Sequence, residues 1–364
     1  MMNIHCTNCR RPYPDAGLPY LCPVCGGVFD FSEKLSLMSG SIDEDQPGIW
    51  RYQDTFILPE GAPVVTLGEG NTPLGWSEVD GKPVALKLEY LNPTGSFKDR
   101  GSAVLVSLLK AYQVESAVED SSGNAGASLA AYCSRAGIQA RIFVPDYAAG
   151  PKRAQIAAYG ADVVRILGPR SNAGIAVRKA AEAGAVYASH AYMPFGMAGY
   201  ATIAYELFGQ LGEAPGTLVA PAGQGGLLLG IGRGFEALLQ AGRIERLPRL
   251  IGVQARACAP LWSLFSFGPA GLGWVSEGET LTEGIRVKHP VRGDPLLQLV
   301  EKSQGAFFAV DEEDILPARD QLTRSGFYVE PTSAVVWPVL KMLKDESPDP
   351  IVAILTGSGY KFRG

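Results

Sequence analysis

The most specific pattern in this chain is Asn92-Pro93-Thr94-Gly95-Ser96-Phe97-Lys98-Asp99-Arg100-Gly101. Its proline and first glycine interrupt regular structure, and the serine that follows can cap a helix. Apolar residues then recur at helical spacing between residues 104 and 112, which predicts a helix starting near Lys98. The positive backbone end of a helix disfavours an ammonium group, so this lysine is easier to hold as a neutral amine that attacks an aldehyde. Local chemistry alone leaves an exposed surface lysine as the commoner alternative.

These ten residues resemble the cofactor-lysine segment of threonine synthases. That family belongs to the fold-type II pyridoxal-phosphate enzymes, together with the tryptophan synthase β chain and the serine/threonine dehydratases. The resemblance implies that the cofactor is pyridoxal 5'-phosphate and that Lys98 carries it as a Schiff base.

Strand-like and helical stretches alternate beyond this segment. Residues 141–144 and 163–166 are rich in β-forming side chains, residues 152–159 between them are helical in pattern, and residues 202–211 predict a further helix. Such alternation predicts an α/β fold in which helices cover parallel strands.

The 364 residues suffice for one large or two medium domains. The resemblance implies the three-layer, tryptophan synthase β-like architecture with two parallel-sheet domains. We expect a large cofactor-binding domain at residues 31–90 and 206–364, a small α/β domain at residues 91–205, and a zinc-ribbon-like module at residues 1–30.

Two C-x-x-C pairs near the start, separated by residues 10–21, predict this module: Cys6, Cys9, Cys22 and Cys25. Four thiolates complete a closed tetrahedral site, so a bound zinc would be structural. Two disulfides, unusual in a cytosolic protein, or four free thiols are the alternatives. Zinc ribbons also occur in nucleic-acid-binding proteins, so the module does not decide the function, although some threonine synthases have a similar cysteine-rich start.

A loop of small residues, Ser121-Ser122-Gly123-Asn124-Ala125-Gly126, joins a predicted strand to a predicted helix. Backbone N–H groups at such a junction suit an anion, although a tight turn capped by Asn124 explains the pattern equally well. The resemblance implies that Ser121, Ser122 and Gly123 hold the substrate carboxylate and that Asn124 faces the ring hydroxyl of the cofactor.

A second glycine-rich loop follows the apolar residues 218–221 and precedes an apolar helical run. Glycines let the backbone close around a phosphate, and the next helix directs its positive end at it. The loop lacks the dinucleotide-binding spacing. The resemblance implies a cup for the cofactor phosphate made of Gly223, Gln224, Gly225, Gly226 and Leu227.

The chain closes with a predicted strand, residues 351–355, and the turn Thr356-Gly357-Ser358-Gly359. By itself this is an ordinary turn. The resemblance implies that one of its hydroxyls contacts the pyridine nitrogen of the cofactor, with Thr356 as the first choice and Ser358 as the second.

The activity implied is that of a threonine synthase, a lyase of amino-acid biosynthesis that converts O-phospho-L-homoserine and water into L-threonine and phosphate. Substrate phosphate needs cationic or hydroxyl partners, for which Lys87, Arg100 and Arg286 are candidates. Family members often carry Asn-Pro-x-Arg-x-Glu-Gly where residues 191–200 lack that arginine and glutamate, and an aspartate where residues 360–362 are Tyr-Lys-Phe.

Two alternatives therefore stay open. One is a related β-elimination or β-replacement enzyme, such as a serine/threonine dehydratase or a cysteate-type synthase. The other is a catalytically degenerate enzyme body that serves, with its zinc ribbon, as a binding module.

The net charge of −5 argues against a nucleic-acid partner, whose phosphates demand a basic face. No apolar run reaches the length of a membrane span and no apolar signal segment opens the chain. We expect a cytoplasmic protein acting on a small-molecule amino acid, and the resemblance implies a homodimer.

Overall fold

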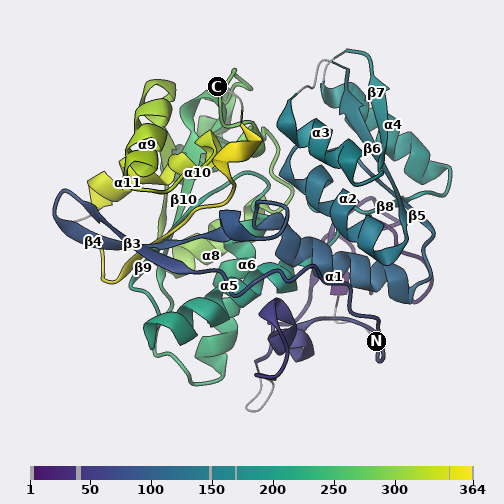
Figure 1. Cartoon of the computed structure of the whole chain (residues 1–364), viewed down its shortest axis with the longest axis horizontal. Coiled ribbons are helices and arrows are strands. Elements are labelled where there is room, and N and C mark those ends of the chain that lie inside the picture. Colours follow the sequence, from purple (N-terminus) through teal and green to yellow (C-terminus); the bar gives the residue numbers. More distant parts are fainter. Residues whose placement is uncertain (1–3, 38–41, 147–149, 169, 344, 363–364) are drawn as a thin grey trace.

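The computed structural model describes residues 4–37, 42–146, 150–168, 170–343 and 345–362 of the chain. Within these ranges the strands form two larger sheets and one two-stranded sheet. Figure 1 shows the four-stranded sheet with its helices on the right and the six-stranded sheet on the left. The predicted α/β class with parallel strands is confirmed. No helix in the described ranges has both the length and the apolar character needed to cross a bilayer.

The six-stranded sheet has the order β11-β10-β9-β12-β4-β3. Its strands are β3 (Leu74–Val79), β4 (Lys82–Lys87), β9 (Thr217–Pro221), β10 (Arg249–Ala255), β11 (Ala306–Val310) and β12 (Ile351–Ile354). Only β3 and β4 are antiparallel. β9 and β12 are buried along their whole length, as expected for parallel strands covered on both faces.

The four-stranded sheet is parallel throughout and has the order β7-β6-β5-β8. Its strands are β5 (Ser116–Glu119), β6 (Gln139–Pro145), β7 (Asp162–Ile166) and β8 (Val186–Tyr187). Because neighbouring strands run the same way, the loops after β5 and β8 leave from one edge of the sheet. That edge is where open parallel sheets bind ligands.

The helices are α1 (Lys98–Ala111), α2 (Asn124–Ala136), α3 (Pro151–Ala158), α4 (Arg170–Glu182), α5 (Gly196–Leu211), α6 (Gly226–Gln240), α7 (Pro260–Phe267), α8 (Gly293–Lys302), α9 (Glu312–Arg324), α10 (Pro331–Ala334) and α11 (Val336–Leu343). The helix predicted at residues 152–159 and the strands predicted at 141–144 and 163–166 are confirmed as α3, β6 and β7. The expected boundary between residues 205 and 206 falls inside α5, so the division into domains remains a prediction.

Three helices pack closely where the two larger sheets meet. A Cβ atom at Gly199 of α5 would lie 2.1 Å from the carbonyl oxygen of Arg100 in α1. A Cβ atom at Gly234 of α6 would lie 2.4 Å from the carbonyl oxygen of Ala201 in α5. Any larger side chain would force these helices apart, so the glycines set how near the start of α1 lies to the start of α6.

The N-terminal residues form a separate hairpin of β1 (Ile4–Cys6) and β2 (Phe29–Phe31). Asp30 accepts two hydrogen bonds from Arg233 of α6, at 2.7 and 2.8 Å. Arg292 donates to the carbonyl oxygen of Phe29 at 2.7 Å and lies 3.8 Å from Asp30. The hairpin is therefore fixed to the larger part of the protein by a small group of charges.

Candidate active site

Lys98 is the first residue of α1, as the sequence predicts. The turn before it is paired with the turn after β12. The N–H of Phe97 donates to the carbonyl oxygen of Thr356 at 3.1 Å, and the N–H of Ser358 donates to the carbonyl oxygen of Gly95 at 3.0 Å. Gly95 has a φ of +86°, in the left-handed region that glycine adopts without strain. The fold thus brings the two motifs together from opposite ends of the chain.

The amine of Lys98 lies in a partly buried environment with little compensating charge. Burial lowers the pKa of Lys98 to about 8, an effect that Glu119 and Glu330 oppose in part. A larger fraction of this amine is therefore neutral near pH 7 than for an exposed lysine, whose pKa is about 10.4. A neutral amine is the form that attacks an aldehyde.

Asn124, the first residue of α2, lies beside the same turn. Its Nδ2 donates to Oε1 of Glu330 at 2.8 Å, and Glu330 pairs with Lys152 at 2.8 Å. A Cβ atom at Gly357 would lie 2.2 Å from Oε1 of Glu330 and 3.0 Å from Nδ2 of Asn124. Glu330 therefore occupies the space between Asn124 and the turn after β12.

The buried atoms Oδ1 of Asn124 and Oγ of Ser96 have no hydrogen-bond partner among the described residues. Leaving a buried polar atom unpaired costs about 1–3 kcal/mol, so such atoms point to a missing ligand. Their position beside the Lys98 turn fits a polar group of a cofactor bound there.

The hydroxyl groups of the last turn have different surroundings. Thr356 is buried, and its Oγ1 lies 3.0 Å from Oγ of Ser333. Ser358 uses its Oγ to accept from the N–H of Tyr360 at 3.3 Å. Ser333 supplies a third hydroxyl, which no sequence motif indicates as part of the site. Its signal was the Pro-Thr-Ser-Ala run at residues 331–334, which resembles an ordinary helix start.

The glycine-rich loop joins β9 to α6, as predicted. Gly225 has a φ of +91°, and a Cβ atom there would lie 2.9 Å from the carbonyl oxygen of Arg292. No side chain of the described residues caps the N-terminus of α6, so its first N–H groups are available to an anion. The side chain of Gln224 accepts from the N–H of Val291 at 3.0 Å, which holds the loop in place.

Tyr200 connects this loop to the Lys98 turn. Its ring centroid lies 5.2 Å from that of Phe97. Cβ atoms built at Gly101 and Gly226 would lie 2.6 and 3.8 Å from its ring. The starts of α1 and α6 therefore flank one tyrosine, which belongs to none of the sequence motifs.

The loop after β5 carries the predicted carboxylate-binding residues. The N–H of Gly123 donates to Oγ of Ser121 at 3.3 Å, and Ser122 lies between them. A Cβ atom at Gly126 would lie 1.9 Å from the carbonyl oxygen of Ser121, so a glycine is needed there. Within the part of the chain that the structure describes, no side chain caps α2, which leaves N–H groups for an anion at this end of the helix.

Arg100 does not face this site. Its guanidinium is fully buried and donates to Glu89 and Glu206 at 2.7 Å. Burial alone would lower the pKa of Arg100, but the two carboxylates outweigh burial and raise it. Lys87 is fully buried as well and pairs with Glu206 at 2.7 Å. These contacts correct the expectation that Arg100 binds substrate, because its donors are already engaged.

The third candidate cation, Arg286, donates to the carbonyl oxygen of Glu277 at 2.8 Å. It lies in the loop-rich segment before α8 and is half-buried. Of the three candidates, it alone is not buried in an ion-pair network.

The four N-terminal cysteines lie together, with all their Sγ atoms within 4.8 Å of one another. The Sγ atoms of Cys6 and Cys25 are 3.4 Å apart, and those of Cys9 and Cys22 are 3.7 Å apart. Sulfur atoms about 2.3 Å from a tetrahedral zinc are separated by similar distances, so the residues fit this metal.

The fold and the site define a pyridoxal-phosphate enzyme, and comparison with known proteins supports this class. The profile of the family described as pyridoxal-phosphate dependent enzyme matches residues 65–357. The structure is similar to that of a T.th. threonine deaminase, with a TM-score of 0.68 and 28% identity over 80% of this chain and 94% of that one. Maize serine racemase, at 23% identity and a TM-score of 0.68, shares the fold over 79% of this chain and 88% of its own.

Curated relatives narrow the assignment. The threonine synthase of Methanocaldococcus jannaschii is 33% identical over 98% of this chain and 92% of its own length. The threonine synthase of Synechocystis is 36% identical over 85% of this chain and 82% of its own length. The chain belongs to the threonine synthase family of fold-type II pyridoxal-phosphate enzymes.

Proposed function

We propose that this protein is a lyase that converts O-phospho-L-homoserine and water into L-threonine and phosphate. The observation that carries the proposal is the meeting of three elements at one place: an amine of lowered pKa, an uncapped helix after a glycine loop, and a turn bearing hydroxyl groups. The names of the curated relatives supply the product, L-threonine. The substrate is the one that the resemblance of the sequence motifs implies.

The residues present fit the cofactor. Lys98 would hold its aldehyde, the N–H groups of residues 223–227 its phosphate, and Asn124 its ring hydroxyl. Thr356, or Ser358 in second place, would contact the ring nitrogen with a neutral hydroxyl. When bound, pyridoxal phosphate supplies an electron sink for charge that develops at the α carbon of an amino acid.

The chain itself supplies binding and proton transfer. Backbone N–H groups of the Ser121–Gly123 loop would bind the substrate carboxylate at the uncapped start of α2. The amine of Lys98 would then take the proton from the α carbon, since its lowered pKa suits a general base near neutral pH. A neutral hydroxyl at the ring nitrogen, in place of a carboxylate, favours elimination or replacement at the side chain over transamination.

An amino-acid dehydratase is the alternative that an experiment must separate from this proposal. Arg100 is held by two carboxylates, and the amine of Lys87 donates to Glu206, Gln210 and the carbonyl oxygen of Thr72. Neither residue therefore supplies a cation for substrate phosphate. The likeness to a threonine deaminase at 28% identity is consistent with that reading.

A substrate panel separates the two. Purified protein loaded with pyridoxal phosphate is incubated with O-phospho-L-homoserine, L-threonine or L-serine, and Lys98→Ala serves as the control. Threonine and phosphate in equal amounts from the first substrate support the proposal. Keto acid and ammonia from the other two, with no phosphate released from the first, would replace it with the dehydratase.

We also propose that the cysteine cluster binds one structural zinc. Its support is the spacing of the sulfur atoms. Metal analysis of freshly purified protein is expected to give one zinc per chain, and Cys22→Ser is expected to lower that content. A metal-free protein that remains fully folded would contradict the assignment. A homodimeric state and a cytoplasmic location remain predictions from the sequence.

A further inference from the structure

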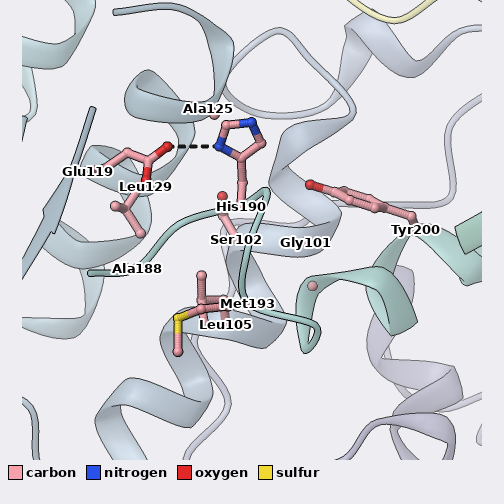
Figure 2. Close-up of a pocket in the computed structure, with 11 residues that line it drawn as sticks. Gly101, Ser102, Leu105, Glu119, Ala125, Leu129, Ala188, His190, Met193 and Tyr200 are labelled. Carbon is pink, nitrogen blue, oxygen red and sulfur yellow. Dashed lines mark hydrogen bonds and ion pairs between the residues drawn. The ribbon is translucent and has the colours of Figure 1, made fainter. Parts of the chain in front are cut away.

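A narrow cavity lies against the first turns of α1 (Figure 2). Gly101 and Ser102, one turn beyond Lys98, form part of its wall. His190, from the segment before α5, and Tyr200, in the second turn of α5, form another part, and Glu119 at the end of β5 forms a third. The remaining lining is small or apolar, so the polar groups of this cavity are few and close to the proposed catalytic amine.

Glu119 and His190 meet because of the sheet topology. β5 and β8 are neighbouring parallel strands with Val118 opposite Tyr187, so the residues that follow emerge at the same edge. Oε1 of Glu119 lies 2.8 Å from Nδ1 of His190. The same edge carries the proposed carboxylate-binding loop, which follows β5 directly.

The pair has unused hydrogen-bonding capacity. Glu119 is 1% exposed, and its Oε2 has no hydrogen-bond partner among the described residues. His190 keeps a quarter of its side-chain surface exposed. Figure 2 shows its second ring nitrogen directed away from Glu119, with the hydroxyl of Tyr200 pointing toward the ring. One nitrogen of the imidazole is thus held by the carboxylate, and none of the described residues forms a hydrogen bond with the other.

The charges around the pair disfavour an imidazolium. Burial lowers the pKa of His190 well below its ordinary value, and the positive charges of Lys98 and Arg170 lower it further. Burial and the charge of Asp120 raise the pKa of Glu119, against the opposing effect of Lys98 and Arg170. Tyr187 donates to Asp120 at 2.7 Å and so completes the set of polar groups at this edge.

We propose that His190, oriented by Glu119, donates and accepts protons at the side-chain end of the amino-acid substrate. The inference rests on the proposed function, in which the amine of Lys98 serves the α carbon. When Nε2 gains a proton, the proton on Nδ1 passes to Oε1 of Glu119. The pair then changes from one negative charge to neutral, so no imidazolium is buried. The reverse transfer returns the proton to the substrate or to water.

The test separates protons at the α carbon from events at the side chain. O-phospho-L-homoserine is incubated in D2O with the loaded enzyme, and α-proton exchange and phosphate release are followed by NMR. His190→Asn keeps a donor toward Glu119 and removes the second nitrogen. We expect its phosphate release to fall about 10²- to 10⁴-fold, the usual contribution of general acid–base catalysis, while α-proton exchange stays within about threefold.

Two further variants complete the design. His289→Asn alters an exposed histidine outside the cavity and is expected to leave both rates unchanged. Glu119→Gln keeps a hydrogen bond to His190 but cannot take up a proton, so its phosphate release is expected to fall with a changed pH profile.

A spectroscopic readout does not depend on turnover. The chain has three histidines, so the 15N imidazole spectrum of the cofactor-free protein is simple, and His190→Asn identifies the signal of interest. His190 is expected to remain neutral, with its proton on Nδ1, from about pH 8 to about pH 5, while an ordinary histidine titrates in that range.

Three results would overturn the inference: equal loss of both rates in His190→Asn, no loss of either rate, or a His190 signal that titrates between about pH 8 and about pH 5. Absence of α-proton exchange in the unaltered protein would instead refute the proposed function, and with it the role of Lys98 on which the inference depends.

Discussion

Lys98 and Arg100 stand two residues apart at the start of α1, yet their surroundings give them opposite properties. The amine of Lys98 is partly buried, no carboxylate of the described residues forms an ion pair with it, and its pKa falls to about 8. The guanidinium of Arg100 is fully buried between Glu89 and Glu206, which raise its pKa. A buried cation with few opposite charges nearby loses its proton more easily and becomes reactive. A buried cation paired with carboxylates keeps its proton and holds the structure together.

The second group of charges also connects distant parts of the chain. Glu206 comes from α5, Glu89 from the segment after β4, and Arg100 from α1. Arg100 therefore holds together the helices and strands that set the position of Lys98. Substitutions at the two sites should separate catalysis from stability.

The largest expected effect is on activity in Lys98→Ala. Without the amine, the protein should not acquire the absorbance of bound cofactor, and turnover should fall by at least about 10³-fold, because both covalent attachment and α-proton transfer are lost. Absorbance spectra and the phosphate-release assay measure this. A variant that kept normal turnover would contradict the role of Lys98.

Arg100→Met should lower the free energy of unfolding by about 3–5 kcal/mol, because Glu89 is then buried without its counter-charge. Glu206 loses one of its two partners and keeps Lys87. Chemical denaturation against the unaltered protein measures the change. Lys98→Met is the matched control and should cost much less. Equal costs for the two variants would remove the distinction between the sites.

Asp30→Asn tests a charge group that lies between those of Lys98 and Arg100 in how well it is balanced, because one carboxylate is shared by Arg233 and Arg292. Burial lowers the pKa of Arg292 to about 10 despite the opposing charge of Asp30. Removing that charge should destabilise the contact of the N-terminal hairpin by about 1–3 kcal/mol. Faster proteolysis or hydrogen exchange confined to residues 4–31 would show this, and unchanged protection would argue against it.

The smallest effect is a pH dependence. Below about pH 8 the rate at which pyridoxal phosphate attaches to Lys98 should rise about tenfold per pH unit, and it should level off above that pH, since only the neutral amine reacts. Because the pKa of Lys98 is lower in the folded state, the unfolded chain binds more protons between about pH 8 and 10.4. The stability of the unaltered protein relative to Lys98→Ala should therefore rise with pH across that window. A rate that rose only near pH 10 would indicate an ordinary lysine.

The sequence predicted the elements whose patterns are local. The helix at Lys98, the strand and glycine loop before residue 226, and the paired cysteines all follow from turn residues, periodicity or spacing. The helix expected near residue 202 begins instead at Gly196. Glycines weaken the helical signal there, and they are present because α1 passes close to Gly199.

The sequence did not predict which charged side chains pair with one another. Nothing near Arg100 in the chain indicates that Glu206 faces it, since they meet only when α5 packs on α1. The pairing of Glu119 with His190 depends in the same way on two neighbouring strands. Sequence motifs therefore located the candidate site. Tertiary packing determines which of the candidate cations are held in ion pairs and so cannot bind substrate.

The most direct test of the account is to find the amine that holds the cofactor. Protein incubated with pyridoxal phosphate is reduced with borohydride, digested and analysed by mass spectrometry. We expect the label on Lys98. Lys361 is the natural rival, because burial lowers the pKa of its amine to about 8 as well, but that amine donates to the carbonyl oxygen of Thr94. A label on Lys361 with none on Lys98 would contradict the central claim.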